Sequence, residues 1–271
     1  MKKFNSGGVR LRKLLVMKLI FDSKLADKYT NSSQKIRVLS EGWVLKEIYC
    51  PSCGDGIFEY QNNKPVADFY CTKCSEDFEL KSKQGKFGNK ISAGAYSKMI
   101  ERINSAQKPN FFFMAYLLEL LSVDNFFVVP KHFFVSEIIE KRKPLAKTAR
   151  RSGWVGSNIL FSKIPKAGQI FYIENGIEID KKDVLKKWQK TVFLKQVKKI
   201  DAKGWILDIM NCIDSLNKKD FTLEDMYSFE KDLSVIHSEN KNIKAKIRQQ
   251  LQLLRDKGYL VFEGDGKYRL T

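Results

Sequence analysis

The sequence predicts an α/β protein with a winged helix-turn-helix domain at its C-terminal end. From about residue 17 to residue 180, helical patterns alternate with short aromatic and β-branched runs, which is typical of a sheet flanked by helices. After residue 204 the pattern changes to three helical segments followed by two short strands, which is the element order of a winged helix. Two closely spaced cysteine pairs lie inside the first part.

Helices and strands can be placed along the first part from periodicity and turn residues. A helix is expected over residues 32–46, capped by one of the two serines that begin it, and another over residues 91–103, where apolar side chains recur every four residues. The runs NFFFMAYLL, NFFVVP and AGQIFYI are rich in aromatic and β-branched residues and predict buried strands. Asn175-Gly176 predicts a tight turn after the last of them.

The C-terminal part divides into helix patterns and one hairpin. WILDIMNCIDSL, FTLEDMYSFEKDL and NIKAKIRQQLQLLRDKG are the helical segments, and Thr222 with Asp225 resembles a capping box at the second. YLVFEGDGKYRL predicts two strands around a Gly-Asp-Gly turn. We therefore expect three regions: an extension at 1–16 that packs little, an α/β domain at 17–199 and a winged helix at 200–271, with Met17 as a candidate natural start.

The charge balance predicts a polyanionic partner. The chain of 271 residues carries 49 Lys plus Arg against 31 Asp plus Glu, a net charge of +18. This exceeds the charge of about 2–8 that a small domain needs for solubility, and nucleic acid is the usual partner of such a surface. The N-terminus lacks a signal-peptide cleavage pattern and no run is apolar enough to span a membrane, so we expect a cytoplasmic protein. With only two histidines, a His-based catalytic triad is disfavoured.

The cysteine spacing predicts a structural zinc site. Cys50, Cys53, Cys71 and Cys74 form two CxxC pairs separated by 17 residues, which suits tetrahedral Zn²⁺. Unrelated buried cysteines or an iron–sulfur cluster are the alternatives. Four sulfur ligands would leave no coordination position for water, so a catalytic role for zinc is disfavoured. Cys212 stands alone in an apolar helix pattern and is expected to be an inert core residue.

A second set of residues around the cysteines suits a hard cation. In an extended segment Glu79 and Lys81 share one face, while Phe78 and Leu80 face the apolar side. An aspartate on a neighbouring antiparallel strand, Asp68, would place its carboxylate beside Glu79. Two carboxylates and a lysine suit Mg²⁺-dependent hydrolysis of phosphodiesters. Because Glu-x-Lys recurs by chance in charged chains, a solvated strand face is the alternative.

Two basic segments are candidates for contacts with nucleic acid. Arg150, Arg151 and Trp154 combine cations with an aromatic ring, which suits phosphate pairing and stacking, although a solvated loop is equally compatible. In the third C-terminal helix, base or phosphate contacts are expected from its N-terminal part, and in the hairpin from its basic side chains. These candidates are Lys244, Lys246, Arg248 and Gln249 in the helix, and Lys267 and Arg269 in the hairpin.

Several stretches resemble the DpnI-like methyl-directed restriction endonucleases of the PD-(D/E)xK nuclease superfamily. They are NSSQKIRVLSEGWV, YCPSCG, NNKPVADFYCTKCSEDFELKSK, NFFF, KRKPLAKTARRSGW, GWILDIMNCID, FTLEDMY and KIRQQLQLLRDK, and they extend from about Met17 to the end. The resemblance implies a PD-(D/E)xK core, made of a mixed sheet flanked by helices, with a zinc-binding insertion and a C-terminal winged helix. It also implies Mg²⁺-dependent cutting of double-stranded DNA at GATC sites that carry N6-methyladenine.

The resemblance assigns roles to individual residues. Asp68 and Glu79 match the metal carboxylates and Lys81 the motif lysine, with the backbone carbonyl of Leu80 as a further expected magnesium ligand. The four CxxC cysteines match the zinc ligands, and Trp154 matches an aromatic wall for the methylated base. Two other functions stay open from the residues: a nuclease for another modified or structured DNA, and a non-catalytic zinc and winged-helix regulator.

Overall fold

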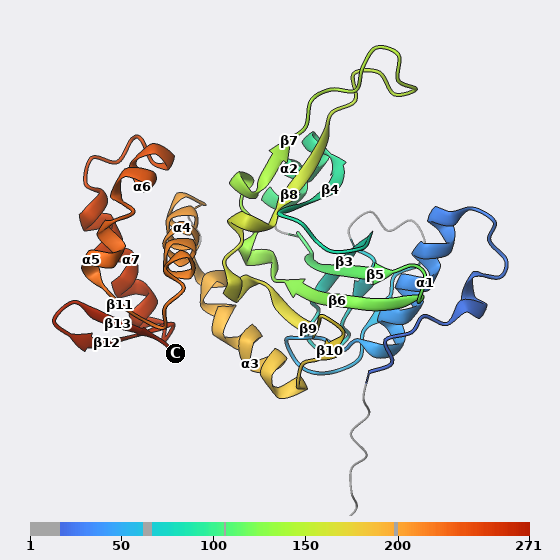
Figure 1. Cartoon of the computed structure of the whole chain (residues 1–271), viewed down its shortest axis with the longest axis horizontal. Helices are drawn as coiled ribbons and strands as arrows, with labels where there is room; N and C mark the ends of the chain where they lie inside the picture. The colour runs from blue at the N-terminus through green and yellow to red at the C-terminus, as the bar shows by residue number, and fades with distance from the viewer. Residues whose placement is uncertain (1–16, 62–66, 106, 198–199) are drawn as a thin grey trace, which may run out of the picture.

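A computed structural model describes residues 17–61, 67–105, 107–197 and 200–271, so the extension predicted at 1–16 lies outside the described residues. The centre of the protein is a seven-stranded mixed sheet with the order β1-β2-β3-β5-β6-β9-β10 (Figure 1). Its strands are β1 (Phe58–Glu59), β2 (Phe69–Tyr70), β3 (Asp77–Gln84), β5 (Asn110–Leu117), β6 (Ser122–Val129), β9 (Ile170–Glu174) and β10 (Ile177–Glu178). The β3–β5 pair is parallel and the other pairs are antiparallel.

Alternating aromatic residues give the sheet two apolar faces. In β5, Phe112 belongs to one core cluster and its neighbours Phe111 and Phe113 to the other, as the two-residue period of a strand requires. Two helices, α1 (Ser32–Glu47) and α3 (Lys181–Thr191), contribute Trp43 and Trp188 to the core on the Phe112 side. The predicted buried strands are confirmed, and the fold class is an α/β domain followed by a helix-turn-helix domain.

The opposite face of the sheet carries a second, three-stranded sheet and one helix. This sheet has the order β4-β8-β7 and is made of β4 (Lys90–Ala95), β8 (Gly156–Leu160) and β7 (Ile139–Lys141), with α2 (Tyr96–Asn104) beside it. The helix predicted over residues 91–103 is therefore wrong in its first part. Ile91 pairs with Ile159 across the antiparallel β4–β8 ladder, and this tertiary pairing outweighs the local spacing of apolar residues.

Short 3-10 helices and one cap complete the first part. The 3-10 helices are η1 (Ser23–Ala26), η2 (Lys131–Phe133), η3 (Ser136–Ile138), η4 (Phe161–Lys163), η5 (Lys166–Gly168) and η6 (Val192–Gln196). The predicted cap of α1 is corrected by one residue: Asn31, not a serine, accepts the amides of Ser33 and Gln34 at 2.9 and 3.2 Å. The turn predicted at Asn175-Gly176 is confirmed, with φ of 50° and 75° at its two residues.

The C-terminal part has the predicted order of elements, with a split second helix and an added strand. It contains α4 (Ile200–Leu216), β11 (Asp220–Thr222), α5 (Leu223–Tyr227), α6 (Glu230–Ile236), α7 (Ile243–Asp256), β12 (Leu260–Gly264) and β13 (Lys267–Leu270). The strands form the sheet β11-β13-β12. The capping box of Thr222 and Asp225 is present at α5.

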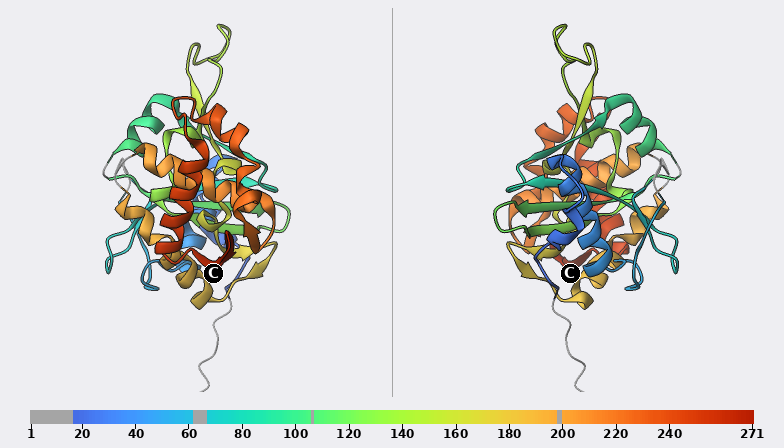
Figure 2. Two further views of the ribbon diagram at one scale, coloured as in Figure 1. Left: turned by 90° about the vertical axis from the view of Figure 1, so that its left-hand side faces the viewer. Right: turned by 90° about the vertical axis from the view of Figure 1, so that its right-hand side faces the viewer.

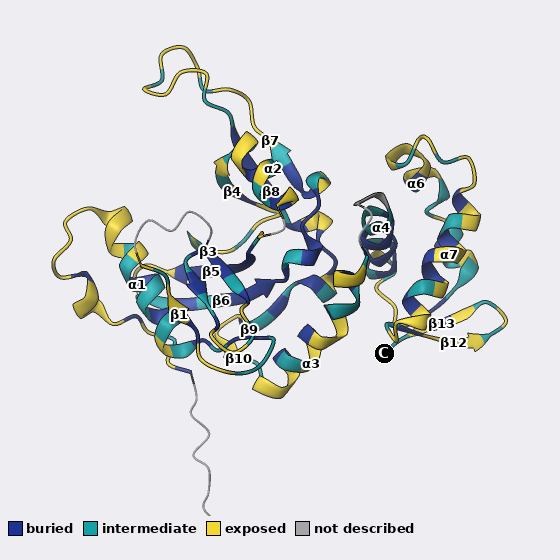
Figure 3. Ribbon diagram, turned by 180° about the vertical axis from the view of Figure 1, so that it is seen from behind, coloured by how far each residue is buried: buried dark blue, intermediate teal, exposed yellow. Residues whose placement is uncertain are grey.

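Helix α4 joins the two parts of the molecule. It lies between the central sheet and the remaining C-terminal helices, and its inner surface is buried (Figures 1 and 3). Asp214 in α4 accepts the amide of Lys166 at 2.7 Å, and Asn211 donates to the carbonyl of Lys163 at 3.0 Å. One continuous core cluster includes Ile164 before the junction and Leu251 after it.

The boundary predicted between residues 199 and 200 adjoins residues outside the description and stays a prediction. Among the described residues, none of the helices combines the length and apolar character needed to cross a membrane.

Candidate metal centres and nucleic-acid interface

The four CxxC cysteines lie in two turns of the same form. In each turn the amide of the first cysteine donates to the carbonyl five residues later, at 2.7 Å for Cys50 and 3.0 Å for Cys71. The residue after the second cysteine has a positive φ, 79° at Gly54 and 56° at Ser75, and its amide donates back to the carbonyl of the first cysteine. This curvature brings both sulfurs of a turn to the same side.

The sulfur atoms converge on one point. All four cysteine Sγ atoms lie within 4.8 Å of one another, with 3.4 Å between those of Cys50 and Cys74 and 3.5 Å between those of Cys53 and Cys71. A tetrahedral Zn²⁺ with Zn–S bonds of about 2.3 Å separates its sulfurs by about 3.8 Å. The cluster therefore fits zinc. Cys212 is buried in α4, as predicted for a core residue.

The second cysteine turn connects β2, which directly follows Asp68, to β3, which carries Glu79 and Lys81. Antiparallel β2 and β3 pair Phe69 with Phe78, and Cys71 and Cys74 lie in the connection between them. Asp68 directly precedes β2 and continues this ladder, since its amide donates to the carbonyl of Phe78 at 2.9 Å. The turn therefore fixes which β3 residues lie opposite Asp68.

Asp68 lies against the Glu79–Lys81 segment. Its Oδ2 accepts the backbone amide of Leu80 at 2.7 Å, between the two predicted catalytic side chains. Burial raises the pKa of Asp68, and the nearby carboxylate of Glu79 raises it further, while the Leu80 amide lowers it. Two neighbouring carboxylates, whose mutual repulsion a cation would relieve, fit the small number of protein ligands that Mg²⁺ usually takes. The Leu80 carbonyl as a ligand stays a prediction.

Glu79 is engaged by two cations. Its Oε1 accepts a hydrogen bond from Nζ of Lys81 on the same strand. Its Oε2 forms an ion pair with Arg102 in α2, with 2.5 Å between Oε2 and Nη1. Only 11% of the Glu79 side chain is exposed. Phe78, on the opposite side of β3, stacks on Phe112 at 4.6 Å between ring centroids, so the predicted division of faces holds. No sequence motif drew attention to Arg102, because α2 is distant along the chain.

A third carboxylate near the pair was also missed. Glu41 of α1 forms an ion pair with Arg37 one turn earlier, at 2.7 Å, and interacts electrostatically with Asp68. Burial raises the pKa of Glu41, and the ion pair with Arg37 lowers it. A glutamate in the middle of an amphipathic helix has no spacing that distinguishes it from a solvated one, so the sequence held no usable signal.

The loop between β7 and β8 is an exposed basic arm. Residues 142–155 extend away from the body of the molecule, and Figure 2 shows the same projection from both sides. No acidic residue occurs between Glu140 and Glu174. Arg150 and Arg151 are exposed near its end. This combination of reach and positive charge suits contact with DNA phosphates.

Trp154 returns from the tip of this arm and is half-buried against its base. The guanidinium of Arg151 lies 4.6 Å from its ring centroid, so the predicted cation and aromatic group is assembled. A side chain at Gly156 would place a Cβ 2.7 Å from the Trp154 ring, so only glycine leaves the ring its present position.

In the winged helix the predicted inner and outer faces of α7 are confirmed. Ile243, Ile247, Leu251 and Leu254 are buried, whereas Lys244, Arg248 and Gln249 are exposed and Lys246 is half-buried. Arg248 donates to the hydroxyl of Tyr227 at 2.6 Å, and Lys246 donates to Gln249 at 2.8 Å. These contacts orient the polar ends along the exposed face of the helix.

The two predicted contacts of the wing differ in their surroundings. Both Lys267 and Arg269 are exposed on β13. Arg269 is paired with Asp220 at 2.5 Å and with Glu263 at 2.9 Å, which offsets its charge. Lys267 is therefore the better placed of the two for phosphate.

Comparison with known families decides the identity. One family model, described as the Dam-replacing family, matches residues 17–197, and a second, described as the Dam-replacing HTH domain, matches residues 201–270. The chain belongs to the DpnI family. The resemblance drawn from the sequence is confirmed, and membership supports a methyl-directed restriction endonuclease with DNA as its partner.

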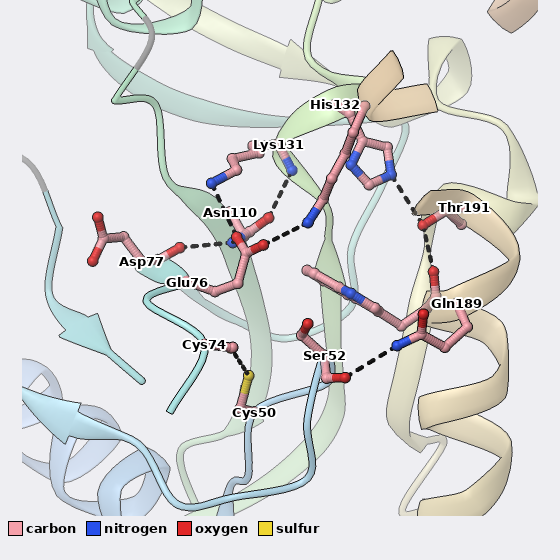
Figure 4. Close-up of polar contacts among 12 residues, drawn as sticks. Cys50, Ser52, Cys74, Glu76, Asp77, Asn110, Lys131, His132, Gln189 and Thr191 are labelled. Carbon is pink, nitrogen blue, oxygen red and sulfur yellow. Dashed lines mark hydrogen bonds and ion pairs between the residues drawn. The ribbon is translucent and has the colours of Figure 1, made fainter. Parts of the chain in front are cut away.

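In this DpnI-family chain a buried carboxylate anchors the turn beside the sulfur cluster. Glu76 accepts contacts from Lys195 at 2.6 Å, Lys131 at 3.0 Å and Asn110 at 2.9 Å (Figure 4). These partners come from η6, η2 and β5. The two lysines and the amide outweigh the cost of burial and lower the pKa of Glu76 to about 2.

Helix α3 is tied to the same region. Gln189 donates to the carbonyl of Ser52 in the first cysteine turn at 3.1 Å, and Thr191 lies 3.0 Å from Nε2 of His132 (Figure 4). Burial lowers the pKa of His132 to about 3, so this imidazole is neutral in the folded protein. The sulfur cluster, β5 and α3 are thus joined by polar contacts around the Cys71–Glu76 turn.

The two centres make a separable prediction. Cys71→Ser removes a sulfur from the cluster and is expected to lower zinc content and thermal stability. Asp68→Ala is expected to abolish DNA cutting while leaving zinc content, measured by atomic absorption, at the wild-type value, because its carboxylate contacts Leu80 and not the cluster. Cys212→Ser, in the core of α4, serves as the control that retains zinc. Loss of zinc from Asp68→Ala would contradict the separation.

Glu76 is expected to stabilise the fold in a pH-dependent manner. A fall from its ordinary pKa of 4.5 to about 2 corresponds to about 3 to 4 kcal/mol of folding free energy, at about 1.4 kcal/mol per pKa unit. Because the folded pKa is the lower one, this stabilisation is complete above pH 4.5 and is lost as the pH falls toward about 2. In urea unfolding, Glu76→Gln is therefore expected to have a lower free energy of unfolding than the wild type. This difference should become smaller as the pH is lowered.

Acid also protonates the cysteines, in the wild type and in Glu76→Gln alike. The informative quantity is therefore the difference between their free energies of unfolding at each pH. Glu101→Gln, which loses an exposed ion pair with Lys98, is expected to leave the free energy of unfolding close to the wild-type value. If the loss of unfolding free energy in Glu76→Gln did not depend on pH, the charge of the carboxylate would not be what stabilises the turn.

Proposed function

We propose that this protein is a type II restriction endonuclease that hydrolyses phosphodiester bonds of double-stranded DNA at GATC sites whose adenine carries an N6-methyl group, with Mg²⁺ as cofactor. One observation carries the proposal: the Asp68 carboxylate accepts the Leu80 amide at 2.7 Å, between Glu79 and Lys81. The contact supports an interpretation of Asp68, Glu79 and Lys81 as one PD-(D/E)xK motif, although Asp68 lies before β2 and the other two residues lie on β3. Family membership supports the restriction activity.

In the proposed mechanism Asp68 and Glu79, together with the carbonyl of Leu80, would hold the divalent cation. When bound, Mg²⁺ neutralises phosphate charge and lowers the pKa of a water ligand. Lys81 Nζ, held by Glu79 Oε1, orients the attacking water or stabilises the charge that develops on the phosphate. Hydrolysis then adds the water oxygen to phosphorus and breaks one P–O ester bond. Zinc at the four cysteines has only a structural role, and a reducing cytoplasm would keep these thiols free to bind it.

The DNA duplex is proposed to contact two separate surfaces. In this proposal Arg150 and Arg151 of the exposed basic arm contact phosphates of the duplex, and α7 presents Lys244, Lys246, Arg248 and Gln249 to the major groove. Lys267, and to a smaller extent Arg269, contact the backbone from the wing. A single contact with a methyl group is worth about 1 kcal/mol, so strong selectivity requires both surfaces to read the site.

Plasmid digestion tests the function. DNA prepared from a host that methylates adenine in GATC is expected to be cut in Mg²⁺, and DNA from a non-methylating host is expected to stay intact. Lys81→Ala should retain DNA binding in a gel-shift assay and lose cutting. Cutting of both plasmids would indicate a nuclease for another target. Binding without cutting by the wild type, with no effect of Lys81→Ala, would indicate a regulator and would contradict the proposal.

Trp154 is expected to contribute to methyl selectivity. Trp154→Ala should lower the ratio of cutting rates on methylated and unmethylated duplexes by about fivefold, which corresponds to about 1 kcal/mol of apolar burial. Gly156→Ala should lower it in the same direction, because the added methyl group displaces the ring. Trp154→Phe, which keeps an aromatic wall, is the control that retains most selectivity. An unchanged ratio in Trp154→Ala would exclude this ring from methyl recognition.

A further inference from the structure

Arg102 is a cation at the proposed active site that the D…ExK motif does not include. It lies in the last turn of α2, and its Nη1 is 2.5 Å from Oε2 of Glu79. Of its side chain 27% is exposed, against 11% for Glu79, so this ion pair is largely shielded from solvent. Lys81 engages the other carboxylate oxygen.

The two cations do not hold Glu79 in the same way. Lys81 Nζ donates a hydrogen bond to Oε1 from two residues away on the same strand. Oε2 is buried, and among the described residues it accepts no hydrogen bond, so Arg102 engages it through charge rather than through an aligned N–H. A buried carboxylate oxygen without an aligned donor keeps part of its desolvation cost, so a metal ion that ligates it directly is a better partner.

A divalent cation and the guanidinium therefore compete for the same oxygen. The proposed role of Glu79 requires one carboxylate oxygen to become a metal ligand, and Oε1 is already bonded to Lys81, which the mechanism needs at the water. Once released from Oε2, the guanidinium would stand beside the metal-binding carboxylates, where the substrate phosphate must lie. Its planar array of donors matches phosphate oxygens in pairs.

We propose that Arg102 holds Glu79 before the divalent cation binds, yields Oε2 to that cation, and then pairs with the phosphate undergoing cleavage. This inference rests on the proposed function, since it needs Glu79 as a metal ligand and a phosphodiester as substrate. In the first state Arg102 is a positioning residue, and in the second it contacts the substrate. If Arg102 had a purely structural role and only neutralised the buried carboxylate of Glu79, its removal would be expected to weaken cation binding.

The sign of the change in cation binding separates these roles. Calorimetric titration of the full-length protein with Ca²⁺ in the absence of DNA is expected to show roughly five- to tenfold tighter binding by Arg102→Gln, because a competing positive charge is removed. Cutting of methylated plasmid at saturating Mg²⁺ is expected to fall by roughly 10²-fold, because a charge-stabilising donor is lost. Arg102→Lys should recover part of the cutting rate.

A matched control lies on the same helix. Lys98→Gln also removes one positive charge from α2, but Lys98 pairs with the exposed Glu101, so both readouts are expected to stay near wild type. Weaker Ca²⁺ binding by Arg102→Gln, or an unchanged cutting rate at saturating Mg²⁺, would overturn the inference. Failure of the proposed function itself is recognised separately: Asp68→Ala would then bind Ca²⁺ as tightly as the wild type.

Discussion

The structure depends on the short turn from Cys71 to Glu76. Its first residue belongs to a cluster of four sulfurs and its last residue is a buried carboxylate held by Lys131, Lys195 and Asn110. A turn of six residues fixed at both ends cannot slip by one position, and a slip by one would turn every side chain of the following strand to the opposite face. The register that places Asp68 between Glu79 and Lys81 is thereby determined.

The proposed active site and the proposed DNA-contacting surfaces differ in their charge. The chain carries a net charge of +18, yet the carboxylates of Asp68, Glu79 and Glu41 lie close enough to interact, with Arg37, Lys81 and Arg102 paired to two of them. In the proposed function a divalent cation binds among these carboxylates, and the basic arm and α7 contact the phosphates of DNA. Because α4 packs into a core shared with the central sheet, the winged helix is held against the nuclease part and is not a loosely tethered module.

Much of this arrangement was predictable from local patterns. The cysteine spacing, the strand phase of Glu79 and Lys81, the inner stripe of α7 and the capping box at Thr222 depend on neighbours within a few residues, and each is found as predicted. The errors and omissions depend on distant contacts. Residues 91–95 became β4 through pairing with β8, and Arg102, Glu41 and the partners of Glu76 reach their sites from other elements.

Hydrogen exchange before and after removal of metal from the cysteine cluster tests most directly whether this turn sets the register. The informative amides are those of Asp68, which donates to Phe78, and Leu80, which donates to Asp68. We predict that both lose protection together when a chelator empties the cluster, while Phe113 in the central β5 strand keeps its protection. Retained protection at Asp68 and Leu80 in the metal-free protein would show that the register does not depend on the cluster.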